Sequence, residues 1–98
     1  TAFFLANDSI AIGAYKAVEE HNLTIPNDIS IIGFNDISIA QYMSPPLTTV
    51  KIYTDFMGET TVNLLMERIK DNRKLSKKVI LPTELVIRKS CIENNNVL

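Results

Sequence analysis

The sequence predicts an α/β fold in which short parallel strands are covered by helices. The stretch 29–34, Ile-Ser-Ile-Ile-Gly-Phe, is almost continuously apolar. This pattern is typical of a parallel strand buried on both faces, whereas a strand with one wet face alternates apolar and polar residues. A second apolar run at 2–5 is followed by a segment with helical periodicity. Strand, helix and strand are therefore expected to form one β-α-β unit.

Each of these two predicted strands leads into an Asn-Asp pair, Asn7-Asp8 and Asn35-Asp36. Ligands of open parallel sheets bind beyond the carboxyl ends of the strands, so we expect both pairs at one rim of the sheet. Carboxamides and carboxylates suit the neighbouring hydroxyls of a sugar or the edge of a base. The same residue types also cap helices and form turns. Both interpretations hold together if Asp8 caps the following helix while Asn7 faces the ligand.

The segment 9–21 is predicted to be a helix that ends at His21-Asn22. Asn tolerates the left-handed conformation found just past a helix, and Pro26 follows soon after. One apolar stripe is expected to pack on the sheet and comprises Ile10, Ala14, Ala17, Val18 and His21. A second apolar set points elsewhere on the helical wheel and predicts burial against a further layer or another subunit; it comprises Ala11, Ile12 and Tyr15.

The remaining elements are predicted from shorter signals. Residues 37–43 are expected to form one or two helical turns that end at the Ser-Pro-Pro of 44–46. Residues 47–52 have the β-branched character of a third strand. Thr54-Asp55 is expected to cap a helix that extends to about residue 71 and carries a wide apolar arc. Two short strand candidates, 79–81 and 85–87, flank Pro82, and the end of the chain is expected to fray.

Composition excludes several classes of function for this chain. The net charge is −1 and no basic patch is present, so nucleic acid is not expected to bind here. The single cysteine, Cys91, excludes an intrachain disulfide and a multi-cysteine metal site, which is compatible with a reducing cytoplasm. No phosphate-binding loop, metal-ligand spacing or nucleophile motif occurs, so neither an enzyme nor a cofactor is expected. No apolar run reaches transmembrane length, and with 98 residues and no initiator Met the chain is expected to be part of a larger protein.

Four motifs together resemble one protein family. They are Leu-Ala-Asn-Asp-Ser-Ile-Ala-Ile-Gly-Ala-Tyr-Lys-Ala at 5–17, Ile-Pro-Asn-Asp-Ile-Ser-Ile-Ile-Gly-Phe-Asn-Asp at 25–36, Pro-Pro-Leu-Thr-Thr-Val at 45–50 and Phe-Met-Gly-Glu-Thr-Thr-Val-Asn-Leu-Leu at 56–65. In this order, over residues 2–87, the chain resembles the carboxyl-terminal part of the regulatory domain of LacI/GalR family transcription factors.

The resemblance implies part of a type I periplasmic binding protein-like fold, with two α/β subdomains and an effector in the cleft between them. Residues 1–50 would belong to the carboxyl-terminal subdomain, and 51–82 would form a crossover and a helix that returns to the amino-terminal subdomain. Residues 83–90 would be the final strand and 91–98 a disordered tail. The family's DNA-binding domain has no counterpart in this chain.

The resemblance also implies roles for individual residues. Asn7 matches a carboxamide that binds the effector, and Asn35 stands where the family usually has an effector-binding Asp. Asn35 keeps the forked geometry but loses the charge, and Asp36 is expected to share its role. The positions that match the family's dimer interface are Ile12, Tyr15, Ile39, Tyr42 and Met43.

The expected function is effector sensing and dimerisation for a cytoplasmic, sugar-responsive transcriptional repressor. Its partners would be a sugar or sugar derivative, a second copy of the chain, and operator DNA held through a domain outside this chain; no membrane partner is expected. One alternative is a solute-binding protein of a sugar transport system with the same fold. The other is an α/β enzyme, for which only Asp8, Asp36 and His21 are available as acid-base groups.

Overall fold

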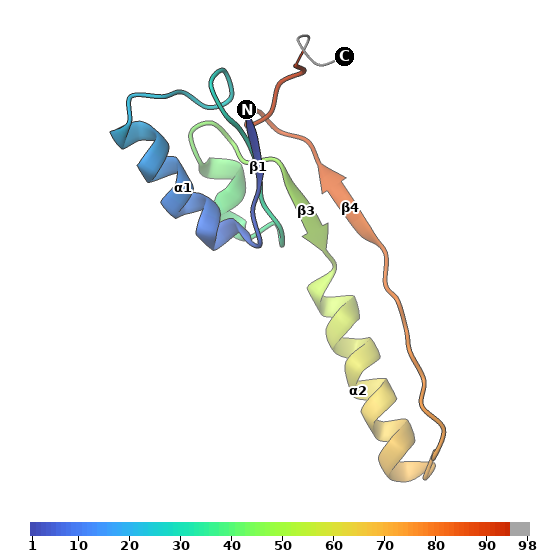
Figure 1. Cartoon of the computed structure of the whole chain (residues 1–98). Helices are drawn as coiled ribbons and strands as arrows, with labels where there is room; N and C mark the ends of the chain where they lie inside the picture. Colours follow the sequence, from blue (N-terminus) through green and yellow to red (C-terminus); the bar gives the residue numbers. More distant parts are fainter. Residues whose placement is uncertain (95–98) are drawn as a thin grey trace. The chain divides into compact units, whose positions relative to one another are not determined.

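The computed structural model describes residues 1–94 of the chain (Figure 1). The elements are, in order, β1 (Ala2–Phe4), α1 (Asp8–Glu20), β2 (Ser30–Ile32), the 3-10 helix η1 (Ser38–Tyr42), β3 (Thr49–Ile52), α2 (Thr54–Lys70) and β4 (Thr83–Val86). They divide into two compact units. The first unit contains residues 1–51 and the chain from 84 onward, and the second contains 52–83.

The predicted β-α-β unit is present in the first unit. Strands β1 and β2 pair in parallel, with Phe3 opposite Ile31. The parallel pairing continues beyond β2, because bridges join Ile32 to Thr48 and Asn35 to Lys51. The parallel α/β class is therefore confirmed.

The core of the first unit lies where α1 meets β2 and the segment after η1. Its buried apolar residues are Ala11, Val18, Ile31, Ala40 and Leu47. Burial in this core stabilises β2, since a strand of three residues has little stability without a packed face.

The predicted inward face of α1 was partly wrong. Val18 is buried, but Ile10 is 49% exposed, and Ala17 and His21 are also exposed. Ala11, which the wheel assigned to the second face, is fully buried, and Tyr15 packs against the same core. Apolar residues lie on several sides of this helix, so their period fixes the helix but leaves open which side faces the sheet.

The ends of α1 follow the expected local chemistry. Asn7 is the N-cap residue, and its Oδ1 accepts a hydrogen bond of 2.9 Å from the Ile10 N–H. Past the other end, Asn22 has φ 57°, the left-handed conformation that the sequence predicted. Helix α2 begins at Thr54 and has Tyr53 as N-cap without a side-chain bond, so the predicted Thr54-Asp55 cap is wrong.

Two expectations about exposure were also wrong. Strand β1 is open to solvent among residues 1–94, with Phe3 55% and Phe4 67% exposed, although burial on both faces was predicted. The strand candidate 79–81 is not a strand; Ile80 is 80% exposed, and no neighbouring strand is recorded for it among the described residues. Sequence identifies an apolar strand, but a strand also needs a partner to satisfy its backbone.

The end of the chain is better anchored than predicted. β4 ends at Val86, short of the predicted 83–90, and residues 87–94 have no regular secondary structure. The buried Ser90 nevertheless joins two segments: its hydroxyl donates to the Ile31 carbonyl over 2.5 Å and accepts the Thr48 N–H over 2.8 Å. The Ile92 N–H donates to Ser30 Oγ over 3.3 Å, so the predicted disordered tail does not begin at 91. Its remainder, 95–98, lies outside the described residues.

Candidate effector rim

The two Asn-Asp pairs lie at one rim of the first unit, as predicted. The turn that follows β1 is held to the turn that follows β2 by a hydrogen bond of 3.0 Å from the Asp8 N–H to the Phe34 carbonyl. Because β1 and β2 are parallel, both turns lie at their carboxyl ends. This is where an open parallel sheet binds its ligand.

Asp8 is the structural centre of this rim and is fully buried. Its Oδ1 accepts a hydrogen bond of 2.6 Å from the Thr49 hydroxyl, and its Oδ2 accepts one of 2.9 Å from the Ile37 N–H. The carboxylate thereby ties the start of α1 to β3 and to the turn after β2. The expectation that Asp8 caps α1 was wrong: Asn7 caps, and Asp8 holds the strand ends together.

Gly33 makes room for that carboxylate. A Cβ placed on Gly33 would collide with Asp8 Oδ1 and would lie 3.0 Å from Leu47 Cδ2. A glycine is needed here for close approach between β2 and the buried side chain. The motif Gly33-Phe34-Asn35-Asp36 therefore combines the space for Asp8 with the polar turn that follows.

The two asparagines differ in how much of their side chain is already engaged. Asn7 uses Oδ1 to cap α1, which leaves its amide NH₂ for another partner. Asn35 donates its backbone N–H to the Val50 carbonyl over 2.8 Å. Among residues 1–94, its half-buried carboxamide makes no hydrogen bond. Asn35 thus presents both a donor and an acceptor at the rim.

Asp36 is paired with a residue that sequence reasoning missed. Arg88 Nη2 lies 2.8 Å from Asp36 Oδ1, and both side chains are mostly buried. Arg88 also donates from Nη1 to the Leu47 carbonyl over 2.8 Å. The two partners of the ion pair are separated by 52 positions, and no local pattern in the sequence connects them.

The five predicted dimer-interface residues divide into two groups. Ile12, Ile39 and Tyr42 are 44%, 48% and 77% exposed, whereas Tyr15 and Met43 pack against the core. The Tyr15 hydroxyl donates to the Pro45 carbonyl over 2.9 Å, and burial raises the pKa of Tyr15 to about 12. Three of the five predicted residues are therefore exposed, and the other two are half-buried against the core.

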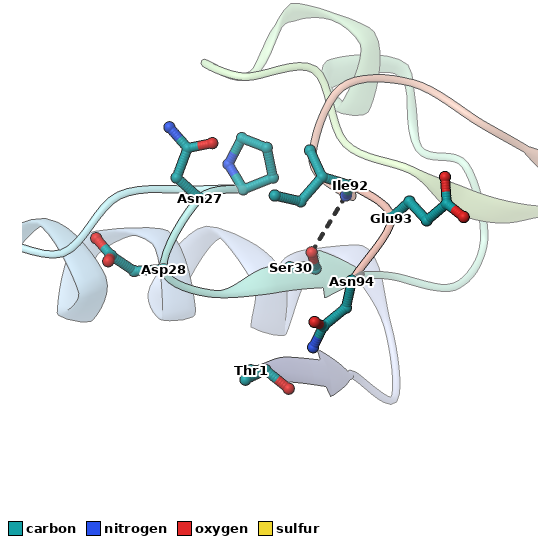
Figure 2. A pocket seen from close by; sticks show the side chains of 8 residues that line it. Thr1, Asn27, Asp28, Ser30, Ile92, Glu93 and Asn94 are labelled. Carbon is teal, nitrogen blue, oxygen red and sulfur yellow. Dashed lines mark hydrogen bonds between the residues drawn. The ribbon is translucent and has the colours of Figure 1, made fainter. Parts of the chain in front are cut away.

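A pocket of about 440 Å³ lies at the opposite ends of the strands (Figure 2). Thr1 and Ser30 line it from the amino-terminal sides of β1 and β2, and Ile92 and Glu93 line it from the end of the chain. A dashed line in Figure 2 marks the bond from Ile92 to Ser30. None of the predicted site residues lines this pocket.

The groups proposed for an enzyme do not form a site. Asp8 is buried and Asp36 is paired, while His21 follows the last residue of α1. The 13 residues of α1 separate His21 from Asp8 by about 20 Å. Within residues 1–94, no three His, Cys, Asp or Glu side chains gather as metal ligands. No helix in the same range is long and apolar enough to span a membrane.

Comparison with known proteins identifies the family. The periplasmic binding protein-like domain matches residues 1–91. The MelR transcriptional repressor of Bacillus subtilis is 52% identical over 90 residues, which cover 92% of this chain and 26% of MelR. The lactose operon repressor of Rhizobium radiobacter is 48% identical over 89 residues, which cover 91% of this chain and 78% of that repressor. This chain belongs to the periplasmic binding protein-like domain family, among its LacI-type regulators.

Solved structures agree with this assignment. A LacI family regulator from Enterococcus faecium with bound ribose superimposes with a TM-score of 0.82 at 36% identity, over 93% of this chain and 34% of that one. The lac repressor dimer bound to operator and the anti-inducer ONPF gives a TM-score of 0.85 at 34% identity, over 95% of this chain and 32% of that one. The periplasmic binding protein-like fold is thereby confirmed.

The chain spans about a quarter of the length of most of the curated relatives that it matches. The matched residues begin at the first residue of this chain. They do not establish the carboxyl-terminal placement within the regulatory domain that the resemblance implied.

Proposed function

We propose that this chain is the effector-sensing and dimerisation portion of a sugar-responsive transcriptional repressor. The observation that carries the proposal is the rim where the turns that contain Asn7 and Asn35 are joined at the carboxyl ends of paired parallel strands. Asn35 offers an unoccupied carboxamide, and Asn7 retains its NH₂ donors. Such groups match the donor and acceptor pattern of neighbouring sugar hydroxyls. The ribose bound to the similar E. faecium regulator supports the same class of effector.

The mechanism follows from binding at a rim built by two turns. An effector that contacts Asn7 and Asn35 favours the arrangement of the regulatory domain in which both side chains reach it. The shift between DNA-binding and released states cannot exceed the difference in the effector's affinity for the two states. Operator DNA would be held by a domain outside this chain.

The first test is the thermal stability of the intact protein against ribose, cellobiose and a panel of other pentoses, hexoses and disaccharides. A ligand that binds only the folded state raises the melting temperature by mass action. We expect a shift with at least one sugar that is lost in Asn35→Ala. Asn63→Ala, which removes an exposed asparagine from α2, is the matched control.

Asn7 requires a different substitution, because Asn7→Ala removes the cap of α1 and costs about 1 kcal/mol regardless of any ligand. Asn7→Asp keeps the capping oxygen, replaces the NH₂ donors with a second acceptor oxygen and adds a negative charge, which a helix N-terminus tolerates. We expect Asn7→Asp to weaken the sugar-dependent shift while leaving the melting temperature without sugar nearly unchanged. A sugar shift that survives both Asn7→Asp and Asn35→Ala would reject this rim as the effector site.

The dimer surface is the second part of the proposal. Ile12, Ile39 and Tyr42 place exposed apolar area on the first unit, and large exposed apolar patches mark association sites. Sedimentation of the intact protein with Ile12→Glu is expected to show monomers. Ile10→Glu, at a nearby position of α1 that is 49% exposed, is the control that should remain dimeric. An intact protein that is monomeric without any substitution and still binds sugar would instead favour a solute-binding protein.

The remaining expectations complete the proposal. We place the protein in the cytoplasm, where a DNA-binding regulator acts, and we assign it no enzymatic activity. We also retain as proposals the carboxyl-terminal placement and the assignment of the second unit, 52–83, to the other subdomain. The division of the chain at 51 and 84 supports that assignment. Sequencing the complete coding region tests the placement, because a helix-turn-helix and a first subdomain should precede residue 1.

A further inference from the structure

Arg88 makes three hydrogen-bonded connections, one to the turn after β2 and two to the segment before β3. Its Nη2 pairs with Asp36 Oδ1 and its Nη1 donates to the Leu47 carbonyl, both over 2.8 Å. Its backbone N–H donates to Thr48 Oγ1 over 2.9 Å. The guanidinium therefore joins the turn after β2 to the segment that leads into β3. A planar fork with several donors suits this double contact, which a lysine could not reproduce.

The turn that Arg88 holds has an unusual backbone. Asn35 has φ 115° and Asp36 has φ 56°, both in the left-handed region that favours glycine. Residues persist in such conformations only when the surrounding structure restrains them. Here the restraints are the Asn35 N–H on the Val50 carbonyl, the Asp36 ion pair, and the Ile37 N–H on Asp8. Arg88 supplies the middle one of the three.

The ion pair also changes the chemistry of the rim. Asp36 was expected to share effector binding, but its carboxylate is engaged by a cation and mostly buried. The rim therefore presents the neutral Asn35 carboxamide instead of a free negative charge. An uncharged, hydroxyl-rich effector fits such a rim, whereas a cationic effector such as an amino sugar would need a free carboxylate.

We infer that Arg88 is a positioning residue for effector recognition. It holds residues 34–37, the effector turn, so that the Asn35 carboxamide faces the rim, and it neutralises Asp36 so that the rim selects uncharged sugars. This inference rests on the proposed function for its ligand. Its effect on the effector turn stands on the geometry alone.

The test uses the intact protein and compares Arg88→Gln with Lys89→Gln. Lys89 is the adjacent exposed cation, and its backbone bond to Pro46 does not depend on its side chain. We expect Arg88→Gln to speed amide hydrogen exchange at Asn35 and Ile37 by about tenfold or more. The reference amide, Leu5 on the Ile32 carbonyl, should be unchanged, as should all three amides in Lys89→Gln.

Sugar binding is then measured in the same variants by the thermal shift with ribose and cellobiose. We expect Arg88→Gln to weaken, by about tenfold, the binding of the uncharged sugar that raises the melting temperature of the wild type. The same variant should bind glucosamine better relative to glucose than the wild type does. The sugar affinity of Arg88→Lys should lie between those of the wild type and Arg88→Gln, because lysine restores the positive charge without the forked guanidinium. If Arg88→Gln does not fold, Asp36→Asn is used instead. It removes the same ion pair, and asparagine tolerates the left-handed backbone at this position.

The outcomes separate the inference from the function on which it rests. Unchanged exchange at Asn35 and Ile37 in a folded Arg88→Gln or Asp36→Asn protein overturns the inference, whatever the sugars do. Faster exchange with unchanged sugar affinity and selectivity also overturns it, because Arg88 would then be structural only. Faster exchange in a protein whose wild type binds no sugar rejects the proposed function and the selectivity, but confirms that Arg88 holds the effector turn.

Discussion

At each end of the strands in the first unit, an aspartate accepts the same two kinds of hydrogen bond, but the two aspartates differ in burial and in how distant their partners are. At the carboxyl ends, Asp8 accepts a threonine hydroxyl and a backbone N–H, from Thr49 and Ile37. At the amino ends, Asp28 accepts the Thr24 hydroxyl over 2.9 Å and the Thr24 N–H over 2.7 Å. Asp8 is fully buried and its partners are 29 and 41 positions away. Asp28 is exposed and its partner is four positions away.

The difference shows at which end of the strands a lost hydrogen bond should cost more stability. A hydrogen bond inside one turn, such as that of Asp28, stabilises a local conformation. If this bond is lost at an exposed site, water can bond to the same groups. A fully buried carboxylate that joins three segments costs far more to disturb, because water cannot readily replace the hydrogen bonds that it accepts. Substitutions at the carboxyl ends of the strands, where the effector rim lies, should therefore cost more stability than substitutions near Asp28.

The largest predicted effect comes from filling the space beside Asp8. Gly33→Ala pushes a methyl group into Asp8 Oδ1 and should lower the free energy of unfolding by about 3 kcal/mol or more. Gly13→Ala in α1 meets nothing within 4 Å and should raise it by about 0.5–1 kcal/mol. Urea unfolding of both variants measures the contrast. Equal changes in the free energy of unfolding would show that the Asp8 carboxylate does not require a glycine at position 33.

The same threonine substitution tests both ends of the strands directly. Thr49→Val removes the hydroxyl that donates to the buried Asp8 and should cost about 2 kcal/mol, because a bond to a buried charge is lost. Thr24→Val removes the hydroxyl that donates to the exposed Asp28 and should cost much less, since water replaces it. Both values come from the midpoints of thermal or urea unfolding. Similar costs would remove the distinction between the two ends.

The predicted pH dependence concerns Tyr15, which packs against the core of the first unit. Burial raises its pKa from 10.0 to about 12, so the folded protein holds the phenol proton more tightly than the unfolded chain. This contribution to stability is complete below pH 10 and is lost as the pH rises to about 12. Stability measured across this range should fall in the wild type and fall less in Tyr15→Phe. An equal fall in both proteins would assign the loss to other groups.

The smallest predicted effect is at Asp28. The hydrogen bonds from the Thr24 N–H and hydroxyl lower the pKa of Asp28 below its ordinary value of 3.8. Its contribution to stability is therefore present above the ordinary range and disappears as the pH falls through the lowered pKa. NMR titration should place the Asp28 pKa below 3.8 and closer to it in Thr24→Val. A pKa that does not move in Thr24→Val would show that the backbone N–H accounts for the whole shift.

The amphipathic pattern of α2 predicted the extent of the helix but not the burial of its apolar face. The sequence predicted its extent to within a residue or two, and its charged face carries Glu67, whose carboxylate lies 3.3 Å from both Arg73 Nε and Lys77 Nζ. The predicted apolar arc is real in sequence but not buried: Val62, Leu65 and Ile69 are more than half exposed. Periodicity identifies a face that can pack, and only a neighbouring element decides whether it does.

The sequence by itself determined the features that depend on a few adjacent residues. The bounds of α1, the left-handed Asn22, the parallel class of the strands and the family motifs all follow from local capping, turn and periodicity signals. Tertiary structure decided which side of α1 faces the core, buried Asp8 against Thr49 at the centre of the rim, and paired Asp36 with Arg88. These choices join residues up to 52 positions apart. Their energies depend on burial and close packing, which exist only once the strands are together.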